Sequence, residues 1–439
     1  MRNHDALPGA DDITRVVLPN GTVVLVRENH NARSAVLAGS LNAGSLYESP
    51  ERAGLASFLA SALLRGTRSR DFATIHEMLE SNGASLSISG GRHTAGFGGK
   101  SLAEDLPMLL DLLADALRNP ALPGDQVERL RGQIVTGIKI HEQDTRYVAG
   151  HMFRQLVYPP EHPYSRQTDG QIETITAITR DDLMDFHRYH YGPSGMLLVV
   201  VGAVDTAGVI QWVEDRFGDW ENPDQPGTPD LPDVPAPDSV RAQTRIMPGK
   251  SQADIVLGFP GPSRLVDDWQ AANLANSILG VFGMYGRIGA EVREKRGLAY
   301  YSFSRLDGGL GPGSWRVVAG VNPENVDQAV GAIVAELERI TGTLVTDEEL
   351  ADNKANFIGR LPLQLESNEG VAASILTMER YGLGMNYLRE YAGIIQAVTA
   401  DEILAAAQRY LDPRAYALAV AGPEPPAAST PAQPGERGD

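Results

Sequence analysis

The stretch "ITAITRDDLMDFHRYHYGPSGMLLVVVG", residues 175–202, occurs a second time in altered form. The chain carries "IQAVTADEILAAAQRYLDPRAYALAVAG" at residues 395–422, an offset of 220 residues. Each copy begins with a threonine suited to a helix N-cap, Thr179 or Thr399, followed by carboxylates in the first helical turn. A proline-containing turn and an apolar run come next, and the apolar run predicts a buried strand. A repeat of this length indicates a duplicated domain rather than a solenoid.

A second pair of similar segments supports the duplication, "LPGDQVERLRGQIV" from Leu122 and "LVTDEELADNKANF" from Leu344. Between the halves, "ENPDQPGTPDLPDVPAPDS" has prolines at positions 223, 226, 229, 232, 235 and 237. Prolines at this density remove backbone donors and disfavour a helix. We therefore expect an N-terminal domain over residues 1–220, an exposed linker over 221–239, a C-terminal domain over 240–422 and a disordered tail over 423–439.

Strands open each half of the chain. In "TRVVLPNGTVVLVREN", residues 14–29, two β-branched runs flank the turn Pro19–Gly21, which predicts a hairpin. Helices follow with strands interspersed, without strict alternation of strand and helix. This order favours an α+β fold in which helices pack on a mostly antiparallel sheet, twice over.

The composition excludes several functional classes. The 439 residues are 42% hydrophobic and include no cysteine, which excludes disulfides, thiolate nucleophiles and cysteine-ligated metals. A formal net charge of -18 argues against a surface that binds nucleic acid or anionic membranes as a whole, although it permits a local basic cavity. No apolar run follows Arg2, so we expect no signal peptide and a cytoplasmic protein.

Two glycine-rich stretches resemble nucleotide-binding motifs only superficially. "TAGFGGKS", residues 94–101, lacks the first glycine of a phosphate-binding loop, and we expect a glycine-rich strand. "DGGLGPGS", residues 307–314, precedes a strand rather than a helix, and we expect a hairpin loop. Nucleotide binding is therefore not predicted for either.

Two histidines are candidates for a metal site. His187 and His190 are three residues apart near a predicted helix end, where their side chains would share one face. A zinc site needs a third ligand, and no carboxylate of the same helix supplies it at the right spacing. We favour helix-end residues without a metal, with relocated zinc ligands as an alternative.

The segment "GLASFLASALLRGT", residues 54–67, lacks any metal ligand, although positions 57, 60 and 61 share one helical face. With its flanks it resembles the pitrilysin, insulin-degrading enzyme and mitochondrial processing peptidase family. In that family a His-x-x-Glu-His motif places two zinc ligands and a general base on this face. The resemblance puts the following residues at the two histidines, the base and the third ligand: Ser57, Ser61, Ala60 and Gly137. We therefore expect this chain to bind no zinc.

A second family signature is retained. "LGVFGMYGRIGAEVREKRGLAYYSFS", residues 279–304, resembles the stretch whose arginine and tyrosine hold the peptide opposite the zinc. Arg293 and Tyr300 match that pair at the family's spacing. A guanidinium and a phenol donate hydrogen bonds to a substrate carbonyl and to a developing oxyanion.

The resemblance implies the metal-less subunit of a small bacterial heterodimeric peptidase, inactive alone. Its partner would be a homologous chain with an intact motif and a bound zinc, and this chain would hold the peptide substrate with Arg293 and Tyr300. The alternative is a non-enzymatic scaffold or peptide-binding homodimer with a peptidase-derived fold. Neither interpretation involves a nucleic-acid or membrane partner.

Overall fold

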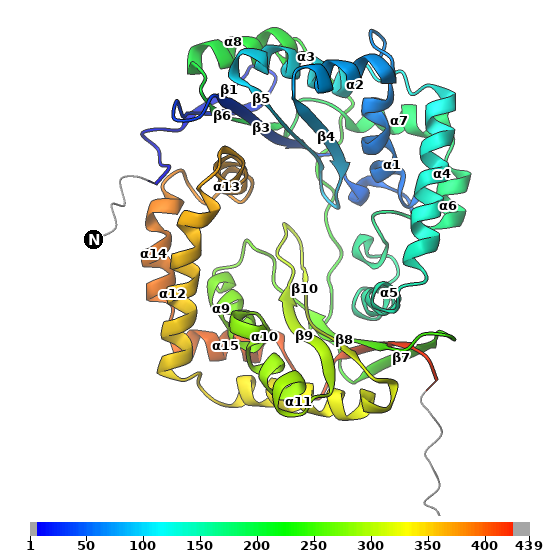
Figure 1. Cartoon of the computed structure of the whole chain (residues 1–439), viewed down its shortest axis with the longest axis vertical. Coiled ribbons are helices and arrows are strands. Elements are labelled where there is room, and N and C mark those ends of the chain that lie inside the picture. Colours follow the sequence, from blue (N-terminus) through cyan, green and yellow to red (C-terminus); the bar gives the residue numbers. More distant parts are fainter. Residues whose placement is uncertain (1–6, 425–439) are drawn as a thin grey trace, which may run out of the picture.

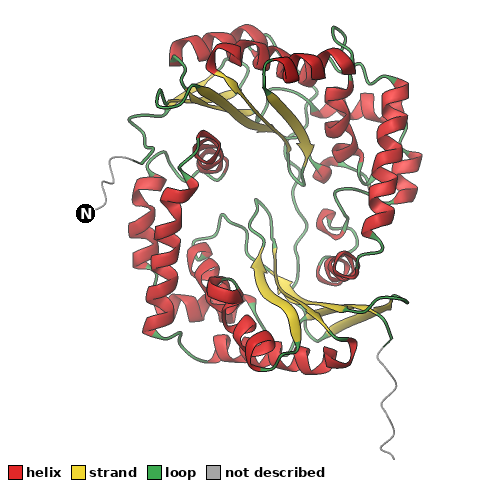
Figure 2. Ribbon diagram, viewed as in Figure 1, coloured by secondary structure: helices red, strands yellow, loops and turns green. Residues whose placement is uncertain are grey.

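The structure is a computed structural model and describes residues 7–424. Two β-sheets lie on opposite sides of the molecule, and most helices cover their outer faces and the two flanks between them (Figures 1 and 2). Within the described residues, no helix combines the length and the apolar character that crossing a membrane requires.

The N-terminal sheet has six strands in the order β1-β2-β6-β3-β5-β4. Its strands are β1 (Thr14–Val17), β2 (Val23–Glu28), β3 (Ser34–Leu41), β4 (Ser85–Gly90), β5 (Ala95–Leu102) and β6 (Leu197–Gly202). Only β2 and β6 run parallel; the other neighbours are antiparallel. The helices are α1 (Leu55–Ala62), α2 (Phe72–Ser81), α3 (Leu106–Arg118), α4 (Gly124–His141), α5 (Thr145–Val157), α6 (Ile172–Ala177), α7 (Arg180–His190) and α8 (Thr206–Phe217).

The C-terminal sheet has five strands in the order β7-β11-β8-β10-β9, with β7 and β11 parallel. Its strands are β7 (Arg241–Ile246), β8 (Ala253–Pro260), β9 (Ala299–Leu306), β10 (Ser314–Val321) and β11 (Ala417–Gly422). Its helices are α9 (Trp269–Gly280), α10 (Phe282–Ile288), α11 (Val326–Gly342), α12 (Asp347–Gln364), α13 (Asn368–Arg380), α14 (Tyr387–Ala397) and α15 (Ala400–Tyr410). A π-helical turn, Gly289–Lys295, precedes β9.

The strand order of the C-terminal sheet repeats that of β2-β6-β3-β5-β4, element for element along the chain. The predicted repeat lies at equivalent places: Thr179 caps α7 and Thr399 caps α15, each in a capping box. The buried strands β6 and β11 follow these helices. The α+β prediction with mostly antiparallel sheets is confirmed.

The two halves exchange helices. The helix α5 of the N-terminal half packs on the C-terminal sheet, where Met152 and Phe153 share a core with Val256. The helix α13 of the C-terminal half packs on β6 and β3 of the N-terminal sheet, in a shared core that contains Ile375, Val199 and Val36. Each exchanged helix lies on the sheet face turned toward the other half (Figure 1). The halves therefore share cores and are not two independently packed bodies.

The predictions for the two glycine-rich stretches and for the first hairpin are confirmed. Residues 94–101 fall in and around β5, residues 307–313 connect β9 to β10, and β1 pairs with β2 in a hairpin. Residues 221–239 form neither helix nor strand. Most of the segment predicted as a disordered tail, residues 425–439, lies outside the described residues.

The helix that contains positions 57, 60 and 61 covers only part of the segment 54–67. The helix α1 ends at Ala62, a 3-10 turn follows, and Gly66 leaves the helical conformation with φ 144°. At the other end Gly54 has φ 95°, which a glycine tolerates best.

Candidate functional site

A buried carboxylate holds the start of α1. The Glu48 side chain accepts hydrogen bonds from the backbone N–H groups of Gly54 at 2.9 Å and Ala56 at 2.5 Å. These donors are among the groups that a helix N-terminus leaves without an internal partner. Burial raises the pKa of Glu48 to about 7, although both hydrogen bonds act in the opposite direction. Sequence reasoning did not identify this residue, because it lies outside the helix that it caps.

The three motif positions on α1 carry no metal ligand. Ser57 is half-buried, and Ala60 is only 1% exposed. The hydroxyl of Ser61 donates to the Ser57 carbonyl oxygen at 2.9 Å, so it satisfies the backbone of its own helix. The backbone of β4 lies very close to this helix, because a Cβ added to Gly90 would lie 2.5 Å from the Ser57 Cα.

The helix that carries Gly137 lies beside α1, as the resemblance requires. Arg131 of α4 places its guanidinium 5.2 Å from the ring centroid of Phe58 on α1. Gly137 contributes no side chain, and a Cβ added there would meet no atom within 4 Å. Hydroxyls, a methyl group and a glycine do not fit a zinc ion, whose protein ligands are His, Cys and carboxylates. Across residues 7–424 no cluster of three or more such side chains is arranged to hold a metal.

The histidine pair does not form the alternative site. His187 lies with Nε2 2.8 Å from the Leu117 carbonyl oxygen, and burial lowers its pKa. The ring of His190 packs against Phe186 and Tyr47, with centroids 4.3 Å and 5.0 Å away. Because no third ligand joins them among the described residues, relocated zinc ligands are not supported.

Arg293 and Tyr300 lie on either side of the turn into β9. Arg293 is half-buried on the π-helical turn and forms no ion pair with another described residue. Tyr300 is 64% exposed, and its hydroxyl donates to Asn322 Oδ1 at 3.2 Å. Its neighbours Ala299 and Tyr301 pair with Val321 and Gly320, so Tyr300 is the extra residue of a β-bulge. A bulge re-aims a side chain and is common beside functional sites.

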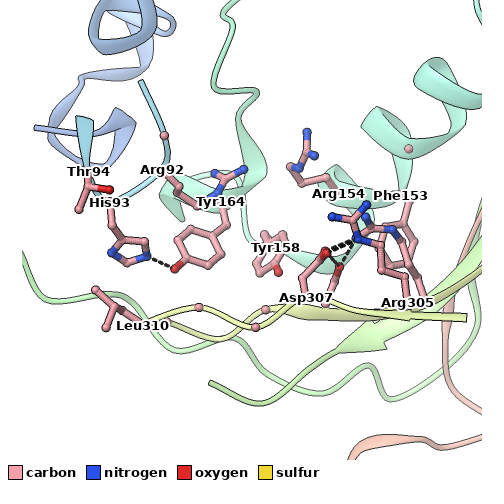
Figure 3. A pocket seen from close by; sticks show the side chains of 18 of the residues that line it. Arg92, His93, Thr94, Phe153, Arg154, Tyr158, Tyr164, Arg305, Asp307 and Leu310 are labelled. Carbon is pink, nitrogen blue, oxygen red and sulfur yellow. Dashed lines mark hydrogen bonds and ion pairs between the residues drawn. The ribbon is translucent and has the colours of Figure 1, made fainter. Parts of the chain in front are cut away.

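A cavity of about 510 Å³ lies between the halves, and sequence reasoning did not predict its lining. Its wall is formed by the β4–β5 turn, α5 and the loop after it, the β9–β10 loop and the C-terminal end of α13. We call it the arginine cavity because it is lined by Arg92, Arg154, Arg305, Arg316 and Arg380. Figure 3 shows Arg92, Arg154 and Arg305 around this hollow.

The environment of the arginine cavity is dominated by positive charge. Desolvation lowers the pKa of Arg154 to about 10, and the neighbouring Arg92 and Arg316 add to this effect. Burial alone would raise the pKa of Asp307, but Arg316 and Arg305 hold it below its ordinary value. Burial, together with Arg92 and Arg380, lowers the pKa of His93 to about 4. His93 is therefore neutral near pH 7, whereas Arg154 keeps its charge.

Comparison with known proteins gives consistent results. The family model "Insulinase (Peptidase family M16)" matches residues 23–158, and the model "Peptidase M16 inactive domain" matches residues 177–357. An "Uncharacterized zinc protease" of Streptomyces coelicolor is 28% identical over 94% of this chain and 90% of its own length. The mitochondrial-processing peptidase subunit beta of Saccharomyces cerevisiae is 28% identical over 82% of this chain and 80% of its own length.

Solved structures agree with the fold. A Helicobacter pylori protease superposes with a TM-score of 0.88 at 21% identity and covers 95% of this chain and 100% of its own. A Pseudomonas fluorescens structure titled "peptidase M16 inactive domain" gives a TM-score of 0.85 at 23% identity, over 94% of this chain and 98% of its own. At these identities the likeness concerns the fold alone.

Proposed function

Because this chain belongs to the insulinase family of M16 peptidases, we propose that it is the zinc-less subunit of a two-chain metallopeptidase. In that assembly it binds the peptide substrate with Arg293 and Tyr300. A homologous partner chain supplies the zinc and the general base.

The observation that carries this proposal is a contrast between two helical segments of one chain. Ser57, Ala60 and Ser61 leave α1 packed on its sheet with no residue able to bind a metal. The π-helical turn and the β9 bulge, by comparison, carry the Arg293 guanidinium, which forms no ion pair with a described residue, and the exposed phenol of Tyr300. If the chain had lost every function of the family, we would not expect it to retain Arg293 and Tyr300 while the metal-binding residues are lost.

The chemistry of the retained pair suits substrate binding. A guanidinium offers five N–H donors in a fixed plane, and a phenol offers one O–H donor. Both can donate to the carbonyl oxygen of a peptide and to the oxyanion that develops there during hydrolysis. The yeast relative is named as a subunit beta of a peptidase, which supports an assembly of more than one chain.

The test is reconstitution with a homologous chain that carries an intact His-x-x-Glu-His motif. We expect neither chain to cleave peptides alone and the equimolar mixture to do so. We also expect metal analysis to find about one zinc per partner chain and none in this chain. A heterodimer by size-exclusion chromatography with light scattering would accompany the activity.

Two outcomes would contradict the proposal. Cleavage by this chain alone, with stoichiometric zinc, would mean that it builds its own metal centre. A stable homodimer that binds peptides, ignores the partner chain and cleaves nothing would support the non-enzymatic scaffold instead.

A further inference from the structure

We propose that the arginine cavity binds the carboxylate groups of an acidic peptide. The choice of a peptide rests on the proposed function, whereas the choice of carboxylates rests on the cavity itself. Neither the degenerate zinc motif nor the Arg293–Tyr300 pair contributes a residue to the cavity lining, although Tyr300 and the lining residue Arg305 lie on the same strand, β9.

The first argument is charge balance. The five arginines that line the cavity face one carboxylate, Asp307. Arg316 hydrogen-bonds Asp307, and Arg305 Nε lies 2.8 Å from its Oδ1, so that carboxylate already serves two cations. The remaining arginines give the cavity an excess of positive charge inside a chain whose formal net charge is -18. Such a cavity concentrates anions and repels cations.

The second argument is the lack of protein partners for two of these arginines. The guanidinium groups of Arg154 and Arg380 form no hydrogen bond and no ion pair with any described residue, and Asp307 acts on Arg154 only at longer range. The Nε atom of Arg380 is buried without a partner. Both side chains are half-buried, and a charge that is partly removed from water without a protein partner is costly to desolvate. An entering anion would supply the missing acceptor.

The third argument is that Arg92 is held in place before any ligand arrives. Its Nη1 donates to the carbonyl oxygens of Pro163 at 3.1 Å and Arg166 at 3.4 Å. Its guanidinium lies 4.7 Å from the ring centroid of Tyr164, whose hydroxyl bonds His93 (Figure 3). These contacts leave Nε and Nη2 without a bond to a described residue. A fixed guanidinium loses less entropy when it binds a carboxylate through both nitrogens.

Size and lining favour a peptide over a small inorganic anion. The volume of about 510 Å³ lies within the range of roughly 300–1,000 Å³ typical of ligand sites. Aromatic rings, those of Phe153, Tyr158 and Tyr381, line the cavity together with the arginines. Aromatic faces suit the backbone and the methylene groups of acidic residues, which an inorganic phosphate lacks.

The experiment measures binding to the full-length chain without partner or zinc. The probes are four fluorescein-labelled pentapeptides with three central residues, either Glu or Gln, and with either an amidated or a free C-terminus. We expect the amidated Glu peptide to bind at least about tenfold more tightly than its Gln counterpart, with affinity falling as salt rises. Preference for the free C-terminus in both series would assign the carboxylate to the chain end instead of the side chains.

Matched variants locate the binding. Arg154→Gln removes a guanidinium that makes no bond to a described residue. We expect this variant to bind the Glu peptide about tenfold more weakly than the wild type does. Arg414→Gln is the control, because Arg414 is highly exposed and its one ion-pair partner among the described residues is Asp412 of its own turn. The affinity of this variant for the Glu peptide should equal that of the wild type. Arg380→Gln is the second variant, and the same loss of affinity for the Glu peptide is expected of it. It serves as the test if Arg154→Gln fails to fold.

Equal affinity for Glu and Gln peptides would overturn the proposal, as would unchanged binding in both Arg154→Gln and Arg380→Gln. If inorganic phosphate displaces the Glu peptide at a lower concentration than free glutamate does, the cavity is a phosphate site and the carboxylate proposal is wrong. The outcome is separable from the proposed function. If the chain binds the Glu peptide but the reconstituted mixture has no activity, the cavity proposal stands and the subunit proposal fails. If the mixture is active but the chain does not prefer the Glu peptide, the subunit proposal stands and the cavity proposal fails.

Discussion

The Thr145 hydroxyl donates a hydrogen bond of 2.5 Å to Asp254 Oδ2, and this bond joins the two halves of the molecule. Thr145 is the first residue of α5, which belongs to the N-terminal half, and Asp254 lies in β8 of the C-terminal sheet. Both side chains are buried. Asp254 also accepts from the hydroxyl of Tyr301 and from Gln252 Nε2. The exchanged helix is therefore fixed at its first residue by a buried carboxylate.

The second exchanged helix is fixed in an equivalent way. Asn368, the first residue of α13, accepts from Asn29 Nδ2 at 2.7 Å and lies with its own Nδ2 3.4 Å from the Ser34 carbonyl oxygen. It is buried as well. The two anchors use different chemistry at matching places in the repeat, so the exchange of helices is a property of the duplicated architecture.

Thr145→Val tests the first anchor. The substitution keeps the shape of the side chain but removes one donor from a buried carboxylate, and we expect a loss of about 1.5–3 kcal/mol in the free energy of unfolding. Urea unfolding followed by circular dichroism measures it. Thr176→Val is the control, because Thr176 is exposed and its hydroxyl donates to the Ile172 carbonyl oxygen of its own helix and to no other described residue. Similar losses in the free energy of unfolding for both variants would mean that the hydrogen bond to Asp254 stabilises the protein no more than an exposed helix bond does.

Two glycines near the degenerate zinc motif should respond in opposite directions to alanine. A Cβ at Gly90 would lie 2.5 Å from the backbone of Ser57, so Gly90→Ala is expected to destabilise the protein by about 1–3 kcal/mol. A Cβ at Gly137, inside α4, would meet nothing within 4 Å, and Gly137→Ala is expected to stabilise by about 0.5–1 kcal/mol. Thermal unfolding of the two variants is the measurement. A loss of stability in Gly137→Ala would show that this position is more constrained than the structure indicates.

Much of the fold could be predicted from the sequence, because the repeat carries local signals. Thr179 and Thr399 are N-caps with acidic partners three residues on, and these signals do not depend on tertiary contacts. The exchange of α5 and α13 could not be predicted. An apolar helix face such as that of Met152 and Phe153 shows that a helix packs, but not which of two similar sheets it packs on.

The candidate sites divide in the same way. The degenerate positions on α1 and the Arg293–Tyr300 pair were identified by resemblance to a family, because each lies within one short stretch of sequence. The arginine cavity has no such stretch: Arg92, Arg154 and Arg380 come from three distant elements. Single arginines in a sequence are ordinarily solvent-exposed, so only the folded chain reveals that these share a cavity.

Glu48 should make stability depend on pH in an unusual direction for a carboxylate. Its pKa rises from 4.5 to about 7 in the folded protein, so the folded state holds the proton more tightly. Its contribution to stability is fully present below about pH 4.5 and is lost as the pH rises through 7. Each pKa unit corresponds to about 1.4 kcal/mol, so the free energy of unfolding of the wild type relative to Glu48→Gln should fall by about 3 kcal/mol between pH 4.5 and 7.5. A constant difference across this range would contradict the raised pKa.

Substitution of Arg293 and Tyr300 tests the role proposed for this chain in the reconstituted peptidase. Tyr300→Phe removes one hydroxyl donor from an exposed ring, and loss of an oxyanion donor would lower kcat about 100-fold with little change in KM. Arg293→Ala would raise KM if the guanidinium holds the bound peptide. Tyr189→Phe and Arg414→Ala are the controls, because both side chains are exposed and belong to neither predicted site. Full activity in Arg293→Ala and Tyr300→Phe, with heterodimer formation intact, would remove the pair from substrate binding and leave this chain a purely structural subunit.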